Sequence, residues 1–137
     1  MGRILALDHG GKRTGVAVSD PLNIIANPLD TISSDQVISF VRDYCQREEV
    51  ETIVVGMPKD LLNRDTDGTA GARKVIQALK KALPEIPVVE VDERFTSKIA
   101  FDTMLSAGVK KSDRRNKATI DKLSATLILQ SFLEQKS

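Results

Sequence analysis

The chain is poor in the residues that build disulfide scaffolds, zinc sites and membrane spans. Among its 137 residues are one cysteine, Cys45, and one histidine, His9. One cysteine excludes an intrachain disulfide, and with one histidine it cannot supply the four ligands of a structural zinc site. No apolar run approaches the roughly 20 residues that a membrane helix needs. With no signal-peptide pattern at the N-terminus, these absences predict a cytoplasmic protein that does not use a membrane.

The overall composition is that of a soluble globular domain. Hydrophobic residues make up 41% of the chain, charged residues 28%, and the net charge is +1. The length predicts one domain over residues 1–137. Positive charge gathers in one place, because Lys110–Lys117 holds five cations and one anion. Such a run is either a solvated loop or a contact for nucleic acid.

Hydrophobic periodicity predicts an α/β fold with a mixed sheet of five strands flanked by helices. The expected strands are Arg3–Leu7, Thr14–Ser19, Ile24–Ile32, Thr52–Val55 and Val88–Val91. Helices are expected from Ser34 to Arg47, after Gly71 to Leu83, from Thr96 or Ser97 to Gly108, and from Thr119 to Glu134. Ser34 or Asp35 is the expected cap of the first helix. A meander of three strands, followed by strands alternating with helices, gives the sheet both antiparallel and parallel pairs.

Three carboxylates stand where an apolar core would exclude charge. Asp8 shares one face of its strand with Ile4 and Ala6, because side chains alternate along a strand. Asp92 and Glu93 directly follow the last expected strand, at the sheet edge where ligands bind in open α/β sheets. Asp121 opens an otherwise apolar helical stripe that continues with Ala125, Ile128 and Phe132.

Clustered carboxylates repel one another unless a cation neutralises them. Carboxylate oxygens are hard ligands that suit Mg²⁺ or Mn²⁺, and two such ions can support hydrolysis of a phosphodiester. Each acid also has a simpler explanation, because Asp8 can form a turn, Asp92 and Glu93 an exposed ion-paired turn, and Asp121 a favourable helix start. The spacing alone does not choose between Asp92 and Glu93.

The whole chain resembles the YqgF family, also called the RuvX-like Holliday-junction resolvases, within the RNase H-like superfamily. The resemblance rests on four stretches, which are Leu5–Asp20, Val54–Pro58, Val91–Ser97 and Ile120–Ser131. It implies an RNase H-like fold and a metal-dependent nuclease whose catalytic and metal-binding residues are Asp8, Glu93 and Asp121. The implied cofactor is Mg²⁺ or Mn²⁺. The implied tasks are 5′-end processing of pre-16S ribosomal RNA and resolution of branched DNA.

A nuclease needs cations beside its acids to hold the phosphate backbone. The candidates are Lys12, Arg13, Arg94, Lys110, Lys111, Arg114, Arg115 and Lys117. Gly10, Gly11 and Gly15 either let a sugar-phosphate backbone come close or serve the turn itself. The loop Lys59–Gly68 is longer than the turn usual in the family, which leaves the substrate preference open.

Two rival functions use the same features. A non-catalytic RNA-binding factor of ribosome assembly would need the basic run but gains nothing from three clustered acids. An ATP-binding module of the actin-like type would need two such domains, which 137 residues cannot provide. The expected partners are therefore pre-rRNA or branched DNA and the ribosome, and the expected state is a monomer or a weak homodimer.

Overall fold

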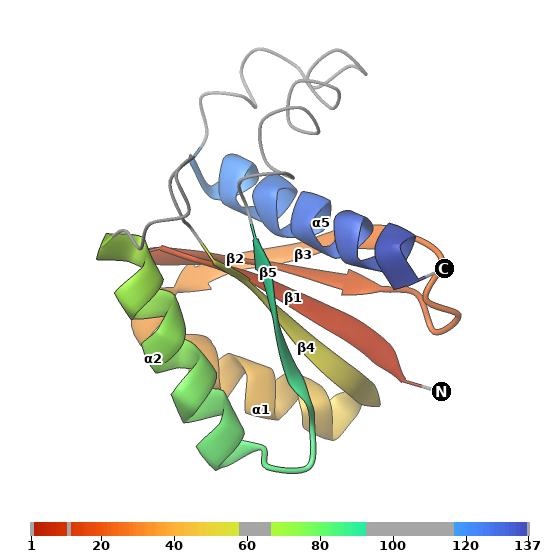
Figure 1. The fold of residues 1–137 in the computed structure, drawn as a ribbon, viewed down its shortest axis with the longest axis horizontal. Coiled ribbons are helices and arrows are strands. Elements are labelled where there is room, and N and C mark those ends of the chain that lie inside the picture. Colours follow the sequence, from red (N-terminus) through yellow and green to blue (C-terminus); the bar gives the residue numbers. More distant parts are fainter. Residues whose placement is uncertain (1, 11, 58–66, 93–116, 137) are drawn as a thin grey trace.

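Five strands form one mixed sheet in the order β3-β2-β1-β4-β5 (Figure 1). The computed structural model describes residues 2–10, 12–57, 67–92 and 117–136. The strands are β1 Arg3–His9, β2 Arg13–Ser19, β3 Ala26–Ser33, β4 Val50–Met57 and β5 Val88–Asp92. The pairs β1–β2 and β2–β3 are antiparallel, and the pairs β1–β4 and β4–β5 are parallel. The predicted mixed sheet of five strands is confirmed.

Helices cover both faces of this sheet. On one face lie α1 Val37–Arg47, which follows the short 3₁₀ helix η1 Ser34–Gln36, and α2 Asp67–Ala82. On the other face lies α5 Lys117–Lys136 (Figure 1). The helix predicted from Thr96 or Ser97 to Gly108 lies outside the described residues. No helix in the described ranges is both long and apolar enough to cross a membrane.

The segment Ile4–Leu7 of the central strand β1 is apolar because both of its faces are covered. Leu5 and Leu7 pack in the cluster that includes α1 and α2. Ile4 and Ala6 point the other way and pack in the cluster that includes α5. All four side chains are fully buried. A continuous apolar run is the sequence pattern expected of a strand buried on both sides.

Several element ends differ from the sequence predictions. β3 begins at Ala26, so Ile24 and Ile25 belong to the loop before it. α2 begins at Asp67, within a stretch that its glycines and aspartates predicted to be a loop. Lys117 is the first residue of α5 rather than the end of a basic loop.

The predicted helix cap at Ser34 is wrong. Ser34 lies within η1. The N-cap residues are Ser33 for η1 and Gln36 for α1, and neither makes a side-chain cap hydrogen bond. The Ser34 hydroxyl instead donates to the carbonyl oxygen of Gly10, 2.6 Å away. The Ser34 hydroxyl therefore links the helical segment before α1 to the β1–β2 hairpin by a hydrogen bond.

Candidate active site

The carboxyl ends of β1, β4 and β5 meet at one edge of the sheet. Because these strands run parallel, Asp8 near the end of β1 and Asp92 at the end of β5 lie at that same edge. Met57, the last residue of β4, pairs with Asp92 and stands between the two strands. Neighbouring strands are about 4.8 Å apart, so the two backbones are separated by about 10 Å.

The acid-bearing elements also share one side of the sheet. Val91 packs in the same cluster as Ile4 and Ala6, which have the parity of Asp8 along β1. In α5, Ala125 and Ile128 complete this cluster, and Asp121 lies four residues before Ala125. The amino-terminal half of α5 lies over the carboxyl end of β1 (Figure 1). The sheet and α5 therefore bring positions 8 and 121 to one edge.

The remaining predicted site residues fall largely beyond what the structure describes. Glu93, Arg94, Lys110, Lys111, Arg114 and Arg115 lie outside the described residues, as does the loop before Asp67 from position 58. Asp92, Asp121 and Lys117 are described by their backbone only. Among the side chains that are described, no group of three His, Cys, Asp or Glu is placed to hold a metal ion.

The hairpin beside Asp8 is held by a chain of hydrogen bonds. His9 Nδ1 lies 3.1 Å from the hydroxyl of Thr14, and this hydroxyl lies 2.9 Å from that of Ser34. Ser34 donates to Gly10, and its backbone N–H donates to the carbonyl of Lys12 at 3.0 Å. A local sequence pattern does not reveal this network, because the bonds of Ser34 reach residues 20 to 24 positions earlier in the chain.

His9 ends β1 and is half-buried. Burial lowers the pKa of its imidazole below the usual 6.5, and the nearby charge of Asp8 acts in the opposite direction. A neutral imidazole at pH 7 is suited to sharing one hydrogen bond with Thr14. Gly71 of α2 lies against the ring, since a Cβ added there would stand 3.3 Å from ring atoms of His9.

Two predicted phosphate-binding cations do lie at this edge. Lys12 is exposed in the turn after β1, and Arg13 begins β2 and is partly exposed. Gly15 is the β2 partner of Asp8, so no side chain on β2 stands directly beside the carboxylate. This arrangement places a carboxylate and two positively charged residues at the same edge of the sheet.

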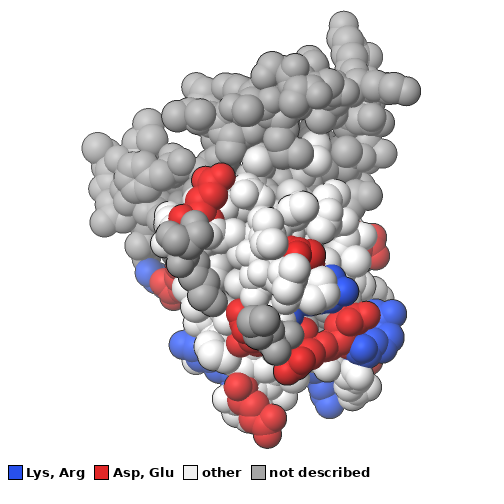
Figure 2. Space-filling model, turned by 90° about the vertical axis from the view of Figure 1, so that its right-hand side faces the viewer, with Lys and Arg blue, Asp and Glu red and all other residues white. Residues whose placement is uncertain are grey.

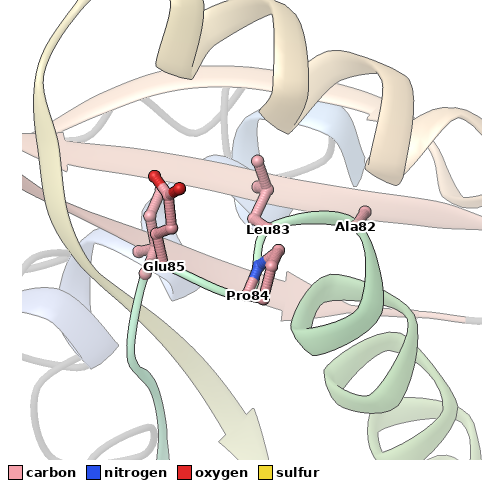
Figure 3. A pocket seen from close by; sticks show the side chains of 5 residues that line it. Ala82, Leu83, Pro84 and Glu85 are labelled. Carbon is pink, nitrogen blue, oxygen red and sulfur yellow. The ribbon is translucent and has the colours of Figure 1, made fainter.

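A pocket elsewhere does not compete with this site. It is lined by Ala82, Leu83, Pro84, Glu85 and Ile86 in the turn between α2 and β5 (Figure 3). That turn leads into the first residue of β5, so it lies at the edge of the sheet opposite Asp8. Its only ionisable side chain is Glu85, which gives no convergent set of polar groups.

Comparison with known proteins agrees with this architecture. The sequence model of the RuvX family, described as Holliday junction resolvase, matches residues 2–135. A Bacteroides fragilis protein named "Putative pre-16S rRNA nuclease" is 50% identical over 136 residues, covering 99% of both chains. A protein of the same name from Phocaeicola vulgatus is 51% identical over 136 residues, covering 99% of this chain and 98% of its own.

A solved structure shares the fold at low sequence identity. It is RuvC of Thermus thermophilus in complex with a Holliday junction substrate, with a TM-score of 0.59 and 15% identity. The match covers 100% of this chain and 97% of that one. The predicted RNase H-like fold is thereby confirmed.

Proposed function

Since this chain belongs to the RuvX family of Holliday junction resolvases, its function is that of a nuclease, and we propose that it hydrolyses phosphodiester bonds at the edge where β1 and β5 end. The observation that carries this proposal is the position of Asp8, a half-buried carboxylate at the carboxyl end of the central strand. An acid there has no role in the apolar core that Ile4 and Ala6 build with α5.

Asp8, Glu93 and Asp121 would hold a divalent cation, Mg²⁺ or Mn²⁺. The donor set fits, because three carboxylates supply hard oxygen ligands and negative charge that a divalent ion neutralises. Val91, two residues before Glu93, faces the α5 side that Ile4 and Ala6 share with Asp8. Asp92 has the opposite parity to Val91 along β5, and it is the family resemblance that assigns the second acid to Glu93. When bound, such ions supply an activated water and stabilise the leaving oxygen.

The rest of the chain positions the substrate backbone. Lys12 and Arg13 neutralise phosphates next to the scissile one, and Gly15 leaves room for the sugar-phosphate chain beside Asp8. The hydrogen bonds from Thr14 and Ser34 keep the hairpin that carries these cations in one conformation. The basic residues Arg94, Lys110, Lys111, Arg114, Arg115 and Lys117 extend the contact and give affinity that depends on salt.

The favoured substrate is the precursor of 16S ribosomal RNA. Relatives that are about 50% identical to this chain carry that name, and each alignment covers nearly the full length of both chains. The family description favours a four-way DNA junction instead. A precursor-rRNA substrate makes the protein cytoplasmic and brings it to the ribosome, whereas paired cuts in a junction would require a two-fold dimer.

The test is cleavage by the wild-type protein and by Asp8→Asn, with Asp30→Asn as the matched control because Asp30 is exposed on β3. Labelled precursor rRNA and labelled four-way junction are each incubated with Mg²⁺, Mn²⁺ or EDTA. We expect metal-dependent cleavage that falls at least about a hundredfold in Asp8→Asn and is unchanged in Asp30→Asn.

The substrate that is cut decides between rRNA processing and junction resolution. A folded Asp8→Asn protein that cleaves normally would reject the proposed metal site. Binding of RNA without cleavage in any metal would favour the rival function, a non-catalytic factor of ribosome assembly.

A further inference from the structure

The loop between β2 and β3 carries most of the exposed large aliphatic side chains in the described residues. Leu22, Ile24 and Ile25 are 65%, 63% and 57% exposed. They lie within four residues of one another, at the sheet edge opposite Asp8. We call Leu22, Ile24 and Ile25 the apolar tip. Contiguous exposed aliphatic groups of this kind mark binding surfaces in soluble proteins.

Hydrogen bonds within the loop hold the apolar tip outward. The carboxylate of Asp20 accepts the backbone N–H groups of Ile24 and Ile25 at 2.7 and 2.8 Å, and that of Leu22 at 3.3 Å. The Asp20 backbone N–H donates to the carbonyl of Ile25. Asp20 thus fixes the backbone at each of the three tip residues, so a partner meets a preorganised surface.

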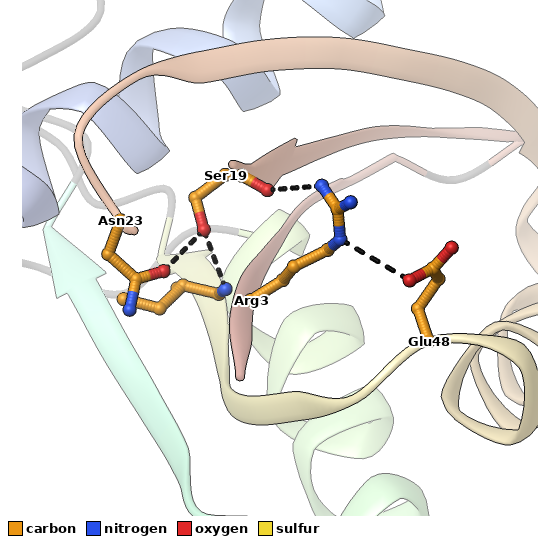
Figure 4. Close-up of polar contacts among 5 residues, drawn as sticks. Arg3, Ser19, Asn23 and Glu48 are labelled. Carbon is orange, nitrogen blue, oxygen red and sulfur yellow. Dashed lines mark hydrogen bonds and ion pairs between the residues drawn. The ribbon is translucent and has the colours of Figure 1, made fainter. Parts of the chain in front are cut away.

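Asn23 anchors the same loop to the sheet and turns its own polar groups inward. Its backbone has a φ of 58°, a left-handed conformation that asparagine tolerates. Its Oδ1 accepts the hydroxyl of Ser19 at 2.6 Å, and its Nδ2 donates to the Gly2 carbonyl and to Glu51. Figure 4 shows this contact beside Arg3, which donates to the Ser19 carbonyl and pairs with Glu48 at 3.6 Å.

A groove runs between the tip and the end of α5. Its lining residues are Asn23, Ile24, Gln130, Leu133 and Glu134. Ile24 and Leu133 give it apolar walls, and Glu134 puts a carboxylate at its side. An aliphatic side chain from a partner fits such walls, and a neighbouring cation on that partner would meet Glu134.

Acidic side chains are frequent at this end of the molecule, where Arg3 and Arg47 also lie. The Asp20 carboxylate accepts a hydrogen bond from the backbone of the tip, and Glu51 accepts one from Asn23. Glu48 and Glu49 are exposed just before β4. Figure 2 faces this end and shows acidic side chains, with some Lys and Arg side chains among them, beside uncharged surface. The phosphates of a nucleic acid or an anionic membrane are repelled by such a surface. A second copy docked by its own tip would bring like charges together, because a two-fold interface uses the same patch twice.

We propose that the apolar tip and the groove beside it bind a basic, apolar segment of a partner protein. Leu22, Ile24 and Leu133 receive its aliphatic side chains, and Glu134, Asp20 and Glu51 attract its lysines or arginines. This surface lies at the opposite end of β1 from the candidate active site, so the proposal does not depend on nuclease activity.

Binding of a defined peptide to the full chain tests the proposal. The probe is a short synthetic amphipathic helix of Leu and Lys, and its control is the same peptide with Glu in place of Lys. Affinity is measured by fluorescence anisotropy, and the contact is mapped by amide chemical shifts. The variant is Leu22→Ser with Ile24→Ser, and the matched control is Leu29→Ser, which changes an exposed leucine of β3. Thermal melting checks that each variant folds.

We expect the Lys peptide to shift the amides of residues 20–25 and 130–134. Its affinity should fall about tenfold or more in the double variant, about threefold in Glu134→Gln, and not at all in Leu29→Ser. Equal binding of the Glu peptide, or amide shifts confined to another surface, would overturn the proposal. So would dimerisation of the free protein, or binding to neutral lipid vesicles, that the double variant abolishes.

Discussion

Replacing Ser19 with alanine should cost more stability than its single lost hydroxyl suggests. The Ser19 hydroxyl accepts the backbone N–H of Ile4 at 2.8 Å and donates to Asn23 at 2.6 Å. Ser19 and Ile4 are both fully buried, so water cannot replace the lost acceptor. An unsatisfied buried N–H costs about 1–3 kcal/mol, and the second hydrogen bond contributes about 1 kcal/mol. Ser19→Ala should therefore lower the free energy of unfolding by about 2–4 kcal/mol.

Urea denaturation and calorimetry measure this loss, and Ser33→Ala is the matched control. Ser33 is exposed at the end of β3, so its substitution should change the free energy of unfolding by less than about 0.5 kcal/mol. For a chain of this size, Ser19→Ala should lower the Tm by about 6–12 °C. A loss no larger than that of Ser33→Ala would refute the argument, because the Ile4 amide would then not depend on the hydroxyl.

Three further changes probe the two ends of the sheet. Gly10→Ala should slow cleavage about tenfold, measured on the labelled substrates, because the added Cβ would stand 2.6 Å from a backbone carbonyl across the hairpin. Charge reversal of Arg114 and Arg115 should weaken nucleic-acid binding and lower the salt slope by about two; equal affinity at every salt concentration would contradict a phosphate contact. Hydrogen bonds, chiefly from the Ile25 N–H, lower the pKa of Asp20 below the usual 3.8. The stabilisation of the fold by the ionised Asp20 is therefore present above pH 3.8 and is lost as the pH falls through the lowered pKa. The Ile25 amide chemical shift should titrate at that lowered pKa in wild type but not in Asp20→Asn.

The sheet and its faces could be predicted because they follow from local hydrophobic pattern. Alternation along β1 predicted that Asp8 shares the face of Ile4 and Ala6, and those two residues do pack on the α5 side. The position of Asp8 at a strand end followed from the same pattern. The acid set remains a prediction, because Glu93 lies outside the described residues.

Ser34 shows why other features could not be predicted. A serine before a helical pattern is a good cap by local rules. Its hydroxyl instead meets the carbonyl of Gly10, 24 positions earlier, because the hairpin folds back onto the start of α1. A contact over that separation is set by the tertiary fold and leaves no local signal.

The early start of α2 has a similar cause. Glycine is a poor helix former, so Gly68 and Gly71 favoured a loop in the sequence. Gly71 nevertheless lies in the helix and faces the ring of His9 at a distance that leaves little room for a methyl group. Packing of α2 against the end of β1 therefore offsets the low helix propensity.

The two ends of β1 have opposite surface chemistry, and this separation has a functional consequence. One end carries Asp8 with Lys12 and Arg13, which suit a phosphate backbone; the other carries the apolar tip among carboxylates. β1 has seven residues, and at about 3.3 Å each the two ends lie about 20 Å apart. A protein segment bound at the apolar tip therefore does not cover Asp8. Under the proposal above, a segment bound there would leave the phosphate contacts of Lys12 and Arg13 open to nucleic acid.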